Sequence, residues 1–219
     1  MYSFSVQVLI EKLDMRRVVL LMWVLIFPLV LKAQIRQSVL ADALSGYSAI
    51  SQAYSLPETK QYITIIDFDL PSTQERLWVY DVANDSILLS THVAHGRNTG
   101  VKKAEVFSNK PNSYQSSLGF YLTGETYRGK NGYSLRLDGL EKGVNDNARV
   151  RNIVMHGANY AEQPFIKKHG RLGRSFGCPA VPRTVNKELI DLIKGKTVLF
   201  IYHSSRDYQR DSKYISRVD

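Results

Sequence analysis

From residue 61 onward the sequence is a series of short apolar segments separated by Gly, Asn and Ser, and this pattern most limits the fold. The segments are residues 63–68, 77–82, 87–93, 118–122, 133–137, 152–155 and 197–202. Runs of this length that are rich in Ile, Val, Leu and Tyr predict β-strands. The last run is apolar throughout, which is typical of a buried central strand. We expect a mainly β domain, a largely antiparallel sandwich or barrel.

Two segments have helical spacing instead. Between residues 38 and 55 the apolar side chains recur at helical intervals, and Pro57 closes the segment. A late helix is expected over 184–193, with Thr184 as its N-cap and Gly195 at its end. The chain after residue 33 is therefore divided into a helical lead-in at 34–58, a β domain at 59–203 and a partly ordered polar tail at 204–219.

The first 33 residues have the pattern of a secretory signal peptide. A basic pair precedes a 14-residue apolar run from Val18 to Leu31, and Ala33 is a small residue suited to cleavage. As a helix the run would span roughly 21 Å, which is shorter than a hydrocarbon core of ~30 Å. Met15 is an alternative start, and an uncleaved membrane anchor is the alternative interpretation. We expect export to the periplasm or cell envelope.

The single cysteine, Cys178, limits the chemistry of the chain. The composition, with 44% hydrophobic residues over 219 positions, is that of a globular protein whose core needs no disulfide. One cysteine allows neither an intramolecular disulfide nor a multi-cysteine zinc site. His92 and His95, three apart in a strand, point to opposite faces and make a poor metal site. The net charge of +9 favours anionic surroundings without choosing among nucleic acid, lipid headgroups and an acidic wall polymer.

Two segments could combine into a thiol site. They are Met155-His156-Gly157-Ala158, after a predicted strand, and Gly173-Arg174-Ser175-Phe176-Gly177-Cys178-Pro179-Ala180-Val181-Pro182. A base beside the thiol and fixed backbone donors are what acyl transfer requires. An imidazolium partner, with Arg171 and Arg174 nearby, would lower the thiol pKa below its free value near 8.5. The alternative is that Cys178 is a small buried apolar residue and His156 a core histidine.

These segments together resemble the murein L,D-transpeptidase catalytic domain family, which has the YkuD-like fold. The closest likeness is to the branch whose cysteine motif reads S-x-G-C-P-A-V. It extends to residues 95–100, 107–109, 116–121 and 132–140, and so covers roughly residues 60–203. The resemblance implies a β sandwich or barrel with a late helix.

The resemblance also implies the roles of the motif residues. Cys178 would be the nucleophile and His156 its general base. The backbone amides of Gly177 and Cys178 would form the oxyanion hole, and Ser175 would support the loop. Gly157 would keep the base accessible.

This sequence departs from the wider family at two positions. Phe176 replaces the second histidine of the cysteine motif, and Ala180 stands where many members carry a basic residue. His169 is a candidate substitute for the imidazole, although a solvated loop residue is the simpler interpretation. The residues expected to contact substrate are Gly157, Arg174, His95 and Tyr121, with Arg97 and Arg136 as further candidates.

The activity implied by the resemblance is peptidoglycan L,D-transpeptidation. Cys178 would form an acyl-thioester with a stem peptide, and a neighbouring amine would resolve it as a 3→3 cross-link; water instead would give an L,D-carboxypeptidase. The expected partners are stem peptides, with no nucleic acid, no cofactor, no metal, no membrane contact beyond the signal segment, and a monomeric state. A sortase-like cysteine transpeptidase and a non-catalytic cell-wall-binding module of the same fold are the alternatives.

Overall fold

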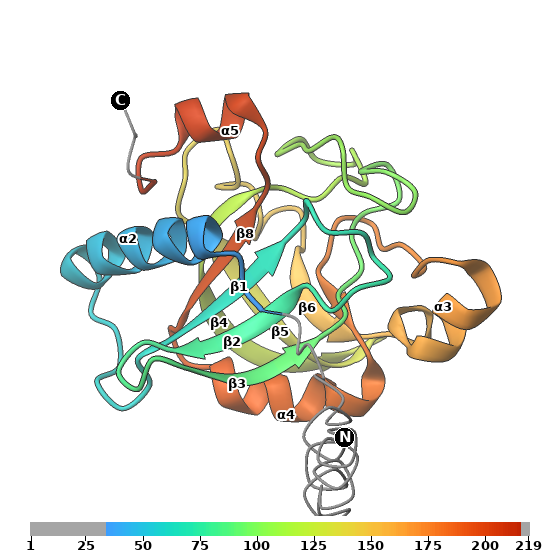
Figure 1. The fold of residues 1–219 in the computed structure, drawn as a ribbon, viewed down its shortest axis with the longest axis horizontal. Coiled ribbons are helices and arrows are strands. Elements are labelled where there is room, and N and C mark those ends of the chain that lie inside the picture. The colour runs from blue at the N-terminus through green and yellow to red at the C-terminus, as the bar shows by residue number, and fades with distance from the viewer. Residues whose placement is uncertain (1–33, 216–219) are drawn as a thin grey trace, which may run out of the picture. The chain divides into compact units, whose positions relative to one another are not determined.

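The computed structural model describes residues 34–215; the expected signal segment, with Met15, and the last four residues lie outside this part. An eight-stranded sheet organises it, in the order β3-β2-β1-β8-β4-β5-β6-β7 (Figure 1). The strands are β1 (Tyr62–Asp67), β2 (Leu77–Asp81), β3 (Ser86–Thr91), β4 (Gly119–Gly129), β5 (Gly132–Gly139), β6 (Val154–Gly157), β7 (Ala180–Val181) and β8 (Val198–Tyr202). The predicted mainly β fold is confirmed. No helix within residues 34–215 is long and apolar enough to cross a membrane.

The last strand of the chain lies at the centre of the sheet. Strand β8 runs parallel to β1 on one side and antiparallel to β4 on the other. All five of its residues are buried, as its uninterrupted apolar sequence predicted. The remaining pairs are antiparallel except for β6 with β7, which are parallel.

The sheet curls so that its two ends meet. Ala94, just after β3, forms an antiparallel bridge with Ala180 of β7, and Gly96 forms a parallel bridge with Ser175. The backbone bond from Ala94 N to Ala180 O measures 2.8 Å. This closure places the cysteine-bearing segment between β6 and the chain that follows β3, as in a barrel.

Helix α2 (Gln37–Ala53) is the predicted lead-in helix, and it packs against β1 and β8. Gly46 faces the sheet, where an added Cβ would lie 2.1 Å from the ring of Phe120. Arg36 precedes the helix and its Nε lies 2.8 Å from the carboxylate of Asp67, at the end of β1. The helix is therefore fixed to the sheet by close packing and by an ion pair at its start.

Helix α4 (Arg183–Ile193) packs against β5 and β6 and turns Leu189, Ile190 and Ile193 inward. The predicted N-cap at Thr184 is wrong, because the helix begins after Pro182. Glu162 Oε1 accepts the N–H of Arg183 at 2.8 Å and also that of Thr184. A carboxylate from a distant segment thus caps this helix, and local sequence could not reveal it.

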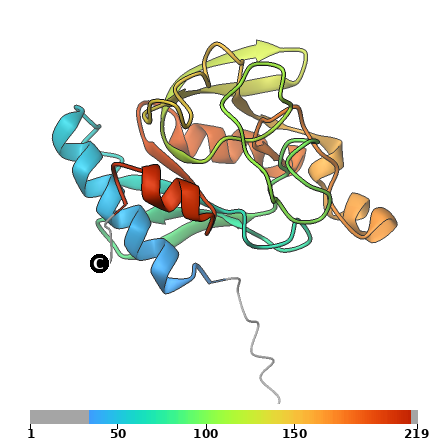
Figure 2. The same ribbon diagram turned by 90° about the horizontal axis from the view of Figure 1, so that it is seen from above.

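The segment predicted as a polar tail is ordered as far as residue 215. It contains helix α5 (Arg206–Asp211), whose Tyr208 hydroxyl donates to the buried carboxylate of Glu141 at 3.2 Å. Ser212 Oγ donates to the same carboxylate at 2.7 Å. Tyr214 packs on Phe120, so the segment covers the same side of the sheet as α2 (Figure 2).

Candidate active site

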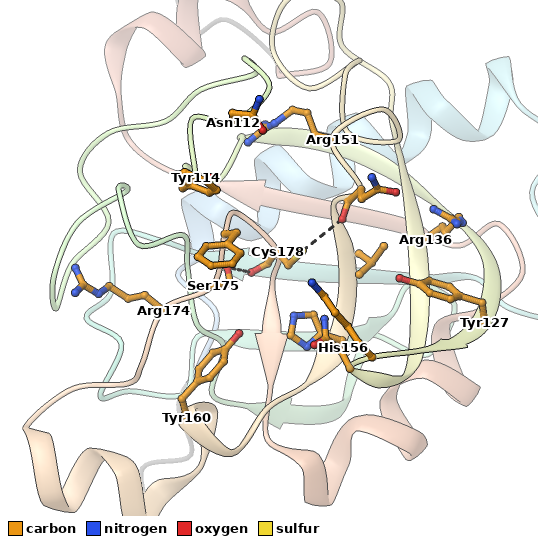
Figure 3. A pocket seen from close by; sticks show the side chains of 15 residues that line it. Asn112, Tyr114, Tyr127, Arg136, Arg151, His156, Tyr160, Arg174, Ser175 and Cys178 are labelled. Carbon is orange, nitrogen blue, oxygen red and sulfur yellow. Dashed lines mark hydrogen bonds between the residues drawn. The ribbon is translucent and has the colours of Figure 1, made fainter.

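Cys178 and His156 line one cavity of about 680 Å³ (Figure 3). Ser175 and Arg174, also singled out from the sequence, line it as well. His156 comes from β6, and the other three precede β7. The link between β6 and β7 contains a short 3₁₀ turn (Asn159–Ala161) and helix α3 (Gln163–His169). The cavity therefore lies at the end of the sheet where the two motif segments meet.

The register of β6 and β7 explains why these two side chains meet. His156 pairs with Ala180 in the parallel ladder. Cys178 lies two residues before Ala180, and alternate residues of an extended chain share a face of the sheet. The offset along the strand is about 6–7 Å, which is one pleat repeat. The fold thus presents the thiol and the imidazole on the same side of adjacent chain segments.

The Cys178 thiol is partly exposed and donates to the Asn152 carbonyl, with the sulfur 3.6 Å from the oxygen. Burial raises its pKa, and the Val154 backbone together with the charges of Arg151 and Lys130 only partly offsets this effect. The predicted lowering of the thiol pKa is therefore wrong for the free protein, because desolvation outweighs the positive charges. The nucleophile starts as a neutral thiol and needs a base to become a thiolate.

His156 is arranged to serve as that base. Its side chain is buried, and its Nδ1 lies 3.1 Å from the carbonyl oxygen of Gly157. A carbonyl can only accept, so Nδ1 carries the proton and Nε2 keeps a free lone pair. Burial lowers the imidazole pKa, and the charges of Arg183 and Lys130 lower it further. The ring is therefore neutral near pH 7 and can accept the thiol proton.

The turn before the cysteine is held by Ser175. Its Oγ accepts the Gly177 N–H at 3.0 Å and donates to the Cys178 carbonyl at 2.6 Å, while Ser116 Oγ donates to the Gly177 carbonyl at 3.1 Å. The Gly177 amide is thus occupied, which corrects the prediction that it serves as an oxyanion donor. The Cys178 N–H remains a candidate, since this amide lies close enough to its own sulfur to favour the thiolate.

Replacing Gly177 with alanine is expected to distort this turn. Its φ is +119°, and an added Cβ would lie 2.7 Å from the Gln115 carbonyl oxygen. We expect the free energy of unfolding to fall by about 1–3 kcal/mol and the alkylation rate of Cys178 to change, measured by chemical denaturation and by mass spectrometry. Gly143→Ala is the matched control, because Gly143 also has a positive φ but open space around it. Equal losses in both variants would contradict the steric argument.

A family model described as the L,D-transpeptidase catalytic domain matches residues 31–202, which is most of the chain. The chain belongs to the L,D-transpeptidase catalytic domain family. The match includes helix α2, so the lead-in helix lies within the family region rather than before it. No curated protein matches the sequence.

Solved structures of L,D-transpeptidases are similar to this chain at low sequence identity. The enzyme from Mycobacterium smegmatis is 10% identical, with a TM-score of 0.41 over 65% of this chain and 59% of that one. Bd1075 from Bdellovibrio bacteriovorus is 18% identical, with a TM-score of 0.41 over 65% and 48%. The L,D-transpeptidase from Stackebrandtia nassauensis is 15% identical, with a TM-score of 0.39 over 75% and 66%. The chain therefore spans about half to two thirds of the length of these proteins.

Two residues expected to bind substrate in this L,D-transpeptidase domain are core residues instead. His95 is 1% exposed, and its Nδ1 lies 2.8 Å from Nη2 of Arg76. Burial lowers its pKa to about 3, so it stays neutral. Tyr121 is fully buried, and its hydroxyl donates to the Ser117 carbonyl at 2.9 Å. Neither side chain lines the cavity, because both point into the packed interior.

Gly157 also differs from its prediction as a substrate contact. An added Cβ there would lie 3.0 Å from the Asn186 Cβ, so this glycine allows β6 to pack closely against α4. Its carbonyl fixes the tautomer of His156, as described above. Arg174 is the only one of the four expected contacts among the residues that line the cavity, and its Nη1 donates to the carbonyls of Arg97 and Gly100.

Phe176, which replaces the second motif histidine, forms part of the cavity wall. It is 60% exposed, lies 5.0 Å from the Tyr114 ring, and has the Arg97 guanidinium above it at 4.8 Å. His169 does not take the place of the missing imidazole, because it stacks on Phe165 at the end of α3, outside the residues that line the cavity. The third group that orients the base is therefore the Gly157 carbonyl.

Sequence reasoning missed several residues that line the cavity: Lys130, Asn131, Asn152, Arg151 and Tyr160. The two-residue turn between β4 and β5 carries Lys130, and the residues just before β6 carry Arg151 and Asn152. Their position beside predicted strands was visible, but their convergence depends on sheet order. Within residues 34–215 no cluster of His, Cys, Asp and Glu could hold a metal ion.

Proposed function

We propose that this protein is a cysteine-dependent peptidoglycan L,D-transpeptidase that forms 3→3 cross-links between stem peptides. The observation that carries the proposal is the pairing of a partly exposed thiol with a buried neutral imidazole in one cavity. Membership of the L,D-transpeptidase family supports peptidoglycan as the substrate. The N-terminal sequence supports export, so we place the reaction in the periplasm or cell envelope.

The first half of the reaction acylates the cysteine. His156 Nε2 takes the thiol proton while Cys178 Sγ bonds to the carbonyl carbon of the third, diamino-acid residue of a tetrapeptide stem. The Cys178 N–H donates to the oxygen that becomes negative. The bond to the terminal D-Ala nitrogen then breaks, and the imidazolium returns the proton to that nitrogen. The products are a thioester and free D-Ala.

The second half resolves the thioester. The side-chain amine of a neighbouring stem attacks the thioester carbonyl, and His156 takes a proton from that amine. The carbon–sulfur bond breaks, the cysteine is reprotonated, and the new amide is the cross-link. Water in place of the amine releases a tripeptide, which is the L,D-carboxypeptidase reaction. Exclusion of water from the occupied cavity favours the amine.

Incubation with defined tetrapeptide muropeptides tests the proposal. We expect mass spectrometry to detect a dimer that has lost one D-Ala, together with the tripeptide from hydrolysis. A donor stem whose scissile bond is replaced by a non-cleavable isostere is the control and should give neither product. Unchanged muropeptides at high protein concentration would contradict the proposal and favour the non-catalytic wall-binding module.

A further inference from the structure

The cavity around Cys178 has an uneven charge. Four of its lining residues are cationic, namely Lys130, Arg136, Arg151 and Arg174, and none is an aspartate or glutamate. Of these four, only Arg136 forms an ion pair within residues 34–215, with Glu125 at 3.0 Å. In Figure 3, Arg136 and Arg174 lie on opposite sides of the cavity with Cys178 and His156 between them. A cavity with this charge favours an anionic ligand.

Arg151 is the cation most firmly fixed beside the nucleophile. Its guanidinium is half-buried and donates only to neutral acceptors: Ser108 O at 2.6 Å, Ser117 Oγ at 3.2 Å, Ser113 Oγ at 3.2 Å and Gln115 O at 2.5 Å. Nη2 would lie 3.3 Å from a Cβ placed on Gly177, the residue before the cysteine. A partly desolvated positive charge without a counter-ion stands next to the reacting sulfur, and an incoming carboxylate would supply that counter-ion.

Lys130 is a second cation that faces the same reacting groups. It lies in the turn between β4 and β5, is exposed, and forms no ion pair within the described residues 34–215. Its charge acts on both Cys178 and His156, which places its ammonium group on the side of the cavity where the thiol and the imidazole meet. Its flexible side chain can therefore follow a ligand that lies over the sulfur.

We propose that Arg151 and Lys130 bind the free C-terminal carboxylate of the residue that leaves during acylation. This inference rests on the proposed function. When the scissile carbonyl lies over Cys178, the carboxylate of a terminal leaving residue is three covalent bonds away, at about 3–4 Å from that carbonyl carbon. Both cations are close enough to the reacting atoms to influence them, so they meet this carboxylate rather than a more distant one. The pair selects donors that end one residue after the scissile bond.

A substrate pair that differs only in this carboxylate tests the inference. One tetrapeptide stem ends in D-Ala as the free acid, and the other ends in the D-Ala carboxamide. We expect kcat/KM for release of the last residue to be at least about tenfold higher for the acid, since a charge-assisted hydrogen bond is lost with the amide. In Lys130→Met and Arg151→Gln the preference should fall several-fold toward one, whereas Arg151→Lys should keep part of it.

The controls separate specificity from folding and from the proposed function itself. Lys142→Gln removes an exposed lysine outside the cavity and should leave the acid preference unchanged. Because Arg151 also holds its loop, thermal unfolding must accompany its variants, and Lys130→Met decides the matter if they do not fold. Equal rates for acid and amide, or a preference unchanged in Lys130→Met and in every folded Arg151 variant, would overturn the inference. A preference that instead follows amidation of the third residue's side-chain carboxyl would also overturn it. Failure of both stems to acylate Cys178 would refute the proposed function.

Discussion

Replacing Cys178 with alanine is expected to abolish acyl transfer by this protein. Cys178 is the only cysteine of the chain, and no other nucleophile in the cavity has a base beside it. We expect the loss to be on the order of 10⁴–10⁶-fold, as for removal of a covalent nucleophile elsewhere. Intact-protein mass spectrometry after incubation with a carbapenem β-lactam measures the effect. Wild type should gain one acyl adduct, and the variant should gain none.

The substitution is small enough to leave the fold intact, which makes the result interpretable. The sulfur is partly exposed, and its hydrogen bond to the Asn152 carbonyl, at 3.6 Å, is a weak one. The thermal unfolding midpoint should therefore stay within a few degrees of wild type. An adduct that persists in Cys178→Ala would contradict the assignment of the nucleophile and with it the proposed reaction.

Replacing His156 with alanine is expected to slow acylation of Cys178 by about 10²–10⁴-fold, the range for loss of a general base. The effect should be large because burial raises the pKa of the thiol, so little thiolate exists near neutral pH without a base. Stopped acylation reactions analysed by mass spectrometry measure the rate. His169→Ala is the matched control, because it removes an exposed imidazole outside the cavity.

The pH profile distinguishes a lost base from a damaged fold. Burial lowers the pKa of His156 below its ordinary 6.5, so the wild-type rate should fall only when acid protonates the ring below that pH. The His156→Ala rate should lack this acidic limb and should rise instead at alkaline pH, as hydroxide forms the thiolate. A variant that acylates at the wild-type rate, or that keeps the acidic limb, would contradict the role given to His156.

The strands and the pairing of the two motif segments could be predicted because local sequence encodes them. The apolar run of β8 identified a central strand, and the helical spacing before Pro57 identified α2. Cys178 and His156 could be selected because thiol chemistry needs both residue types and the motifs keep them together. Their common location in a cavity follows from one parallel strand pair, β6 with β7.

The rest of the site depends on contacts between distant segments. Arg151 precedes β6 and Lys130 follows β4, and only the sheet order brings both to Cys178. His95 and Tyr121 looked accessible in sequence, but the curled sheet directs both inward. The thiol pKa likewise depends on burial, which charge counting along the sequence does not measure. The Ser175 hydroxyl occupies the Gly177 amide through a turn geometry that motif spacing did not specify.

The central position of β8 has a consequence for biogenesis. Residues 198–202 must insert between β1 and β4 before either strand has both of its neighbours, although β1 leaves the ribosome more than 130 residues earlier. A nascent chain can form the β1–β2–β3 meander and the β4–β5 hairpin, but it cannot join them. Such late, long-range pairing slows folding and leaves strand edges open in the meantime. The nucleophile therefore acquires its surroundings only after translation is almost complete, and an incomplete chain carries no assembled catalytic centre.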